Sequence, residues 1–113
     1  MDILERAAGT ATVVTVKGDI TLNKGGDVLL KDKVQSLLQQ GKNQLLLDLG
    51  GVSYVDSAGL GQLVQLHATT MHHGGRMKLL NLTKRLSDLL VVTRLSTVFD
   101  TFDSEDEALA SFK

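Results

Sequence analysis

Cysteine is absent from the 113 residues of this chain, and aromatic residues make up only 4% of it. Without cysteine there is no disulfide, no thiolate nucleophile and no zinc–thiolate site. Basic charge is not in excess either, because 12 lysines and arginines stand against 13 acidic residues, for a formal net charge of −1. Neutralising nucleic-acid phosphates requires a basic excess. We therefore expect no nucleic-acid partner.

Long hydrophobic runs are also missing, and nothing approaches the roughly 18 apolar residues of a membrane span. The first ten residues, MDILERAAGT, carry acidic groups and no long apolar stretch, which argues against a signal peptide. The chain is the size of one domain, and 42% of its residues are apolar, enough for a core. We expect a single soluble, cytoplasmic domain over residues 1–113 with no membrane contact.

The apolar pattern predicts alternating strands and helices. Residues 2–7 and 11–17 are typical of an antiparallel hairpin around Gly9. Further strands are expected at 44–49, 52–55, 76–82 and 97–102, and helices at 27–40, 58–73, 84–92 and after Ser104, which starts an S-x-x-E capping box. The nearly continuous apolar run at 44–49 is typical of a central strand. Alternation after the hairpin implies crossovers and a mostly parallel sheet.

The most informative stretch is SYVDSAGLGQLV at residues 53–64, where a strand pattern changes to a helix pattern. Ser57 has two interpretations. It is a preferred type of helix N-cap, but a helix N-terminus also suits a phosphate, so it is equally a modifiable serine. A cap does not explain Gly59 and Gly61, because glycine is unfavourable in a helix by about 1 kcal/mol. We expect both glycines to leave the first turn bare, so that another molecule can approach Ser57.

Catalytic, metal and cofactor sites are not indicated. Around Ser57 the G-x-S-x-G nucleophile elbow lacks its first glycine. His67, His72 and His73 lie too far along the helix to act as its base, and their spacing does not suit a metal. The glycine pairs at 25–26, 50–51 and 74–75 have no P-loop or dinucleotide fingerprint around them, and we interpret them as turns.

The motif DSAGLG, between a strand and a helix, resembles the phosphorylation motif of anti-sigma factor antagonists in the STAS domain family. Supporting segments are VKGDI at 16–20, LLLDLGGVSYVDSAGLG at 45–61, GGRMKLLNLTKRLSDLL at 74–90 and LSTVFDTFDSEDEAL at 95–109. The resemblance covers nearly the whole chain. It implies an α/β fold with a small mixed sheet, made of an N-terminal antiparallel hairpin followed by mostly parallel strands, and with about four helices packed largely on one side.

The resemblance also implies a function. The serine that matches Ser57 is phosphorylated in the family by an anti-sigma factor that is also a serine kinase of the histidine-kinase-like ATPase type. The unphosphorylated antagonist sequesters that kinase and so releases a sigma factor, and a metal-dependent serine phosphatase restores the serine. By this resemblance the chain is a switch and a substrate, not an enzyme, and is monomeric when free.

The resemblance places partner-binding residues in two segments. They are Asp56, Ala58, Gly59, Leu60 and Gly61 beside Ser57, and Asp19, Thr21 and Asn23 in the loop after the hairpin. Asp56 either positions the Ser57 hydroxyl or only caps backbone donors. The chain departs from the family at G-x-L-D, which here reads Gly18-Asp19-Ile20-Thr21, so Thr21 replaces an aspartate of the partner-binding region. That departure favours the alternative of a STAS scaffold module that is never phosphorylated.

Overall fold

The computed structural model describes all 113 residues and contains one five-stranded sheet in the order β1-β2-β3-β4-β5. The strands are β1 (Asp2–Ala8), β2 (Ala11–Lys17), β3 (Gln44–Gly51), β4 (Arg76–Leu80) and β5 (Thr101–Phe102). Strand β1 pairs antiparallel with β2, and all other neighbours are parallel. The expected mixed sheet with its N-terminal hairpin is therefore confirmed.

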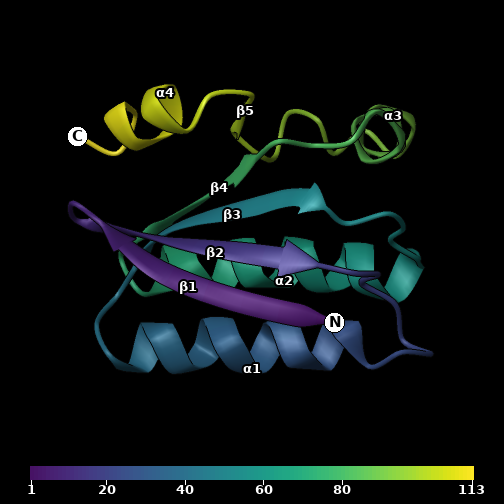
Figure 1. Cartoon of the computed structure of the whole chain (residues 1–113), viewed down its shortest axis with the longest axis horizontal. Helices are drawn as coiled ribbons and strands as arrows, with labels where there is room; N and C mark the ends of the chain where they lie inside the picture. Colours follow the sequence, from purple (N-terminus) through teal and green to yellow (C-terminus); the bar gives the residue numbers. More distant parts are fainter.

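Four helices flank this sheet: α1 (Gly26–Gln39), α2 (Ser57–His72), α3 (Lys84–Val92) and α4 (Glu105–Ala110). Helices α1 and α2 lie together on one face of the sheet, and α4 lies on the other (Figure 1). Helices α1, α2 and α3 all contribute to the larger core, so the helices do pack largely on one side. None of the four is both long and apolar enough to cross a membrane.

Side-chain alternation along β3 explains the two cores. Leu45 and Leu47 point into the larger core, while Leu46 points into the smaller core under α4. All three are fully buried, which confirms the expectation of a central strand covered on both faces.

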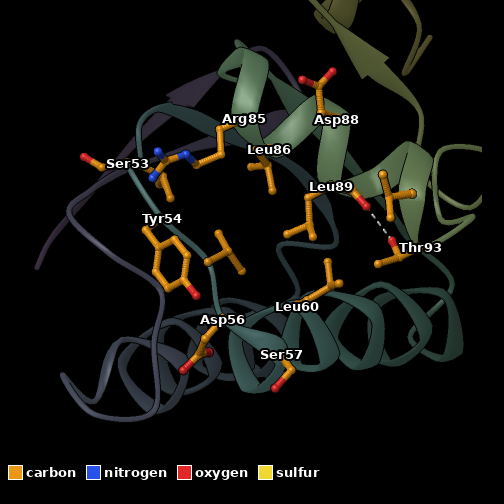
Figure 2. A pocket seen from close by; sticks show the side chains of 13 residues that line it. Ser53, Tyr54, Asp56, Ser57, Leu60, Arg85, Leu86, Asp88, Leu89 and Thr93 are labelled. Atoms are coloured by element: carbon orange, nitrogen blue, oxygen red, sulfur yellow. Dashed lines mark hydrogen bonds between the residues drawn. The ribbon is translucent and has the colours of Figure 1, made fainter.

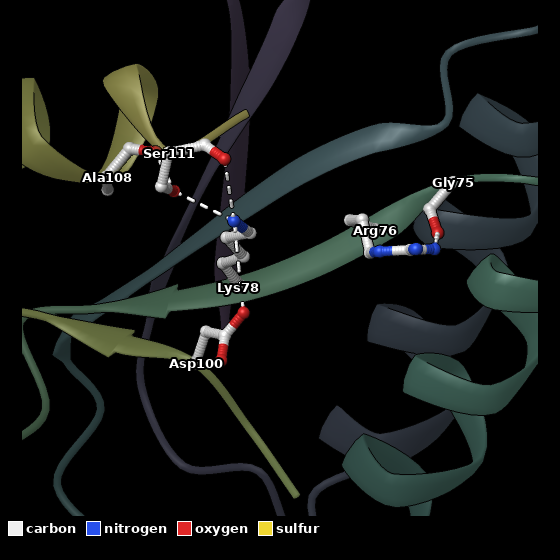
Figure 3. Close-up of polar contacts among 6 residues, drawn as sticks. All are labelled: Gly75, Arg76, Lys78, Asp100, Ala108 and Ser111. Carbon is white, nitrogen blue, oxygen red and sulfur yellow. Dashed lines mark hydrogen bonds and ion pairs between the residues drawn. The ribbon is translucent and has the colours of Figure 1, made fainter. Parts of the chain in front are cut away.

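A buried lysine fastens α4 to the sheet (Figure 3). Lys78 of β4 is only 8% exposed. Its Nζ donates hydrogen bonds to the carbonyl oxygen of Ser111 at 3.1 Å and to the Ser111 Oγ at 2.9 Å. The same ammonium lies 4.8 Å from the centre of the Phe112 ring, within the range of a cation–π interaction. These contacts satisfy the buried charge where the short α4 ends.

Three expected strands are wrong or too long, and the one expected at 76–82 ends at Leu80. Residues 52–55 form no strand, only one parallel bridge between Ile20 and Val55. The last strand is limited to Thr101–Phe102. Before it the chain turns, with the Val98 amide donating to the carbonyl of Leu95, and this turn places Phe99 in the larger core. The helix boundaries agree with expectation to within two residues at each end, where they were given.

Candidate functional site: the N-terminus of helix α2

The site lies beyond the carboxyl ends of β2 and β3, where ligands of parallel sheets commonly bind. The two segments that leave these strands run side by side. The amide of Gly18 donates to the carbonyl of Gly51 at 2.9 Å, and the amide of Ile20 donates to that of Tyr54 at 3.0 Å. The amide of Asp56 then donates back to the carbonyl of Ile20. These bonds fix the chain direction just before α2 begins.

Asp56 is the N-cap of α2. Its Oδ1 accepts a hydrogen bond from the Gly59 amide at 2.7 Å, and its Oδ2 accepts one from the Leu22 amide at 3.0 Å. These two backbone donors, Gly59 first and Leu22 second, hold the pKa of the Asp56 carboxyl below its usual value. Of the two roles expected for Asp56, the structure shows capping of backbone donors. The same carboxylate also ties the 19–25 loop to the helix, through the Leu22 amide.

Ser57 is the first residue of α2 and is exposed. Because Asp56 supplies the cap, the interpretation of Ser57 as the N-cap is wrong. Its hydroxyl has no hydrogen-bond partner within the chain, whereas the hydroxyls of Thr83 and Ser104 do cap α3 and α4. Ser57 is thus an unengaged hydroxyl at the positive end of a 16-residue helix.

The two glycines of the first turns serve different purposes. Gly61 is exposed, and a Cβ there would have no atom within 4 Å, so it does leave the surface bare. Gly59 is buried, and a Cβ there would overlap the carbonyl oxygen of Ile20 and lie 2.9 Å from its carbonyl carbon. The expectation that Gly59 leaves the turn open to another molecule is therefore wrong. Glycine is required at position 59 because the Ile20 backbone occupies the space that a Cβ would need.

The loop after β2 is held by internal contacts. Asp19 forms an ion pair with Lys24 at 2.9 Å. The Thr21 side chain is buried, with 7% exposure, and its Oγ1 accepts a hydrogen bond from the Lys24 amide. The Thr21 side chain therefore shapes the loop, and its part in partner binding stays a prediction. Asn23 is exposed at the tip of the loop.

A pocket of about 440 Å³ opens beside Ser57, between the 52–57 segment and α3 (Figure 2). Leu60, only 9% exposed, lies at the α2 side of this pocket. Ala58, near the start of the same helix, is half-buried and does not line the pocket. The pocket is lined by Val52, Ser53, Tyr54, Val55, Asp56, Ser57, Leu60, Arg85, Leu86, Asp88, Leu89, Val92 and Thr93.

The α3 wall was not identified from the sequence. On that wall, Leu86 and Leu90 are buried in the larger core, and Leu89 is partly buried against it. The signal was available in Val92, an apolar residue outside the face that carries Leu86 and Leu90, and 77% exposed. A large apolar side chain this exposed beside a pocket indicates a surface that something covers.

The histidines lie away from Ser57. None lines the pocket, and the His67 ring packs edge-on against Phe99 with ring centres 5.3 Å apart. His72 and His73 lie at the opposite end of α2. The expected residues 56–61 come together at one end of α2, joined to the 19–25 loop through Asp56 and Leu22.

Comparison with known proteins adds four findings. The family model of the STAS domain matches residues 3–108. The anti-sigma-B factor antagonist of Bacillus subtilis (strain 168) is 36% identical over 90 residues, covering 74% of this chain and 82% of that protein. An anti-sigma factor antagonist from Mycobacterium paratuberculosis has a similar solved structure, with a TM-score of 0.84 at 20% identity over 98% of this chain and 92% of that one. The phosphorylated form of the Bacillus cell fate determinant SpoIIAA has a TM-score of 0.74 at 17% identity, over 99% and 100% of the two chains.

Proposed function

The chain belongs to the STAS domain family, and we propose that it is an anti-sigma factor antagonist switched by phosphorylation of Ser57. When unphosphorylated, it sequesters an anti-sigma factor that is also a serine kinase of the histidine-kinase-like ATPase type, and so releases a sigma factor. A metal-dependent phosphatase restores Ser57. The name of the Bacillus subtilis relative supports the antagonist role, and the phosphorylated SpoIIAA structure supports a phosphorylated form of this fold.

The unengaged hydroxyl of Ser57 is the observation that carries the proposal. Asp56 holds the cap, so a kinase can modify Ser57 without removing a bond that the fold needs. Gly61 leaves the neighbouring surface free of side-chain atoms.

The switch acts through charge. A phosphate adds about 1.5 to 2 negative charges at neutral pH, and the helix N-terminus stabilises them in the free protein. The lowered pKa of Asp56 keeps its carboxylate ionised next to that phosphate. An interface without a facing arginine would have to desolvate both charges, at several kcal/mol. Each 1.4 kcal/mol of binding free energy changes the dissociation constant tenfold. We therefore expect phosphorylation to weaken partner binding by at least about a hundredfold, without refolding of the chain.

Phosphosite mapping tests the proposal. The protein is purified from its native cells across growth and stress conditions, and intact mass and peptide mapping are compared for wild type, Ser57→Ala and Ser53→Ala. Ser53 is a matched control, because it is an exposed serine lining the same pocket. We expect a phosphoryl group in the wild type and in Ser53→Ala that Ser57→Ala lacks. Protein that is never modified under any condition would refute the switch.

A STAS scaffold module without phosphorylation is the second candidate. The observation that favours it is Thr21, which replaces the family aspartate and is buried within its own loop. A scaffold would keep a stable partner under every condition, and its affinity for that partner would be unchanged by any treatment with phosphatase.

A further inference from the structure

We propose that the pocket between residues 52–57 and α3 receives an apolar side chain of the anti-sigma factor, and that a carboxylate of the same partner pairs with Arg85. The inference rests on the proposed function and names a second part of its interface. It adds α3 to a surface that the sequence had confined to the start of α2 and the 19–25 loop.

The shape and lining of the pocket favour an apolar occupant. Its volume of about 440 Å³ is in the range of sites that hold ligands or anchoring side chains. Seven of its 13 lining residues are hydrophobic. At its rim, Tyr54 is 49% exposed and Val92 is 77% exposed. Large apolar groups this exposed are stabilised when a partner covers them.

The position of the pocket favours the protein that acts on Ser57 as the source of that side chain. Asp56 and Ser57 themselves line it, and Figure 2 places both at its edge with their side chains directed outward, so a protein that reaches the Ser57 hydroxyl lies next to the pocket. On the other side of Asp56, Leu22 is 66% exposed, and its amide is bound to the Asp56 carboxylate. Ser57 thus has exposed apolar groups on both sides, the arrangement of an interface core around a central polar group.

The charges around the pocket specify the second contact. Asp88 on α3 is paired with Lys84 at 3.2 Å, but Arg85 between them has no ion pair with any carboxylate of the chain. Figure 2 shows the Arg85 side chain at the edge of the pocket, directed toward the 53–54 segment. An arginine guanidinium binds carboxylates in bidentate geometry and is common at interface hot spots. Arg85 is therefore the residue of this chain that pairs with an acidic residue of the partner.

Paired variants on α3 provide the test. Val92→Asp places a charge in the pocket, and Val91→Asp places the same charge one residue earlier, on an exposed position that does not line it. Arg85→Ala removes the proposed ion pair, and Lys84→Ala removes a neighbouring exposed cation outside the lining. The probe is the ATPase-type anti-sigma factor that co-purifies with the wild-type chain, and its dissociation constant is measured for each variant and for Ser57→Asp.

We expect Val92→Asp and Arg85→Ala each to weaken binding about tenfold or more, while Val91→Asp and Lys84→Ala stay within about threefold of wild type. If Ser57→Asp loses binding but Val92→Asp and Arg85→Ala do not, the inference is refuted and the proposed function stands. Equal losses in the Val91 and Val92 variants would also overturn it, since the effect would not be specific to the pocket. If no such ATPase binds the wild type, the proposed function is refuted and the inference with it.

Discussion

Alanine substitutions at Gly59 and Gly61 are expected to change stability in opposite directions, although both residues lie within the first turns of α2. At Gly59 the new Cβ would overlap the carbonyl oxygen of Ile20 and lie 3.0 Å from the Ile20 Cγ2. The obstacle is largely backbone, and the hydrogen bond from the Asp56 amide holds that carbonyl in place. Relief therefore requires the 19–25 segment to move away from α2.

The magnitudes follow from two competing terms. Replacing a helical glycine by alanine gains about 1 kcal/mol at either position. At Gly61, where an added Cβ would meet no atom from outside its own turn of helix within 4 Å, that gain is unopposed, so Gly61→Ala should be more stable by about 0.5–1 kcal/mol. At Gly59 the overlap is with backbone atoms, so its cost lies at the upper end of the range for overpacking, about 3 kcal/mol, and exceeds the gain. We expect Gly59→Ala to be less stable than wild type by about 2 kcal/mol.

Urea denaturation at equal protein concentration measures both free energies of unfolding. Partner affinity is then measured for Gly61→Ala alone, because that variant is expected to be folded and stabilised. A weaker affinity in this more stable protein would show that the bare surface at Gly61 serves binding and not folding. The reasoning would be refuted if Gly59→Ala were as stable as wild type, or if Gly61→Ala were destabilised.

Two further predictions concern the groups that fasten the loop and α4. The pKa of the Asp56 carboxyl is lowered in the folded state, so its contribution to stability is present above the ordinary value of 3.8 and is lost as the pH falls through the folded pKa. The gap in unfolding free energy between wild type and Asp56→Ala should therefore shrink on acidification in denaturant titrations, and a gap that is constant with pH would contradict the capping geometry. Lys78→Ala should raise amide exchange in α4 about tenfold or more and leave α1 unchanged, because it removes two charge-assisted hydrogen bonds to Ser111. Mass-detected hydrogen exchange that is uniform over the chain would show instead that Lys78 does not act locally.

Elements with strong local patterns were predictable from the sequence. The apolar spacing of Leu30, Val34 and Leu37 determines which face of α1 is buried, and all three are fully buried. The run at 45–47 identified the central strand for a similar reason. The prediction of a strand at 52–55 was wrong. The composition of this segment suits a strand, but the one bridge that it forms depends on where Ile20 lies.

The candidate site was predictable in position but not in mechanism. Asp56 and Ser57 are both good capping residues, and which one caps depends on a one-residue difference in where the helix begins. Gly59 could not be interpreted correctly, because its neighbour Ile20 is distant in sequence. The α3 wall of the pocket was missed for the same reason, since only the fold brings Arg85 and Val92 next to Ser57.

The affinity of the partner ATPase for unmodified and for Ser57-phosphorylated protein decides whether phosphorylation of Ser57 controls binding. Both forms come from one preparation, separated by charge, and isothermal titration gives the two dissociation constants in the same buffer. We expect phosphorylation to weaken binding by about a hundredfold or more, with backbone amide shifts confined to the surroundings of Ser57. Equal affinities for the two forms would contradict the proposed switch.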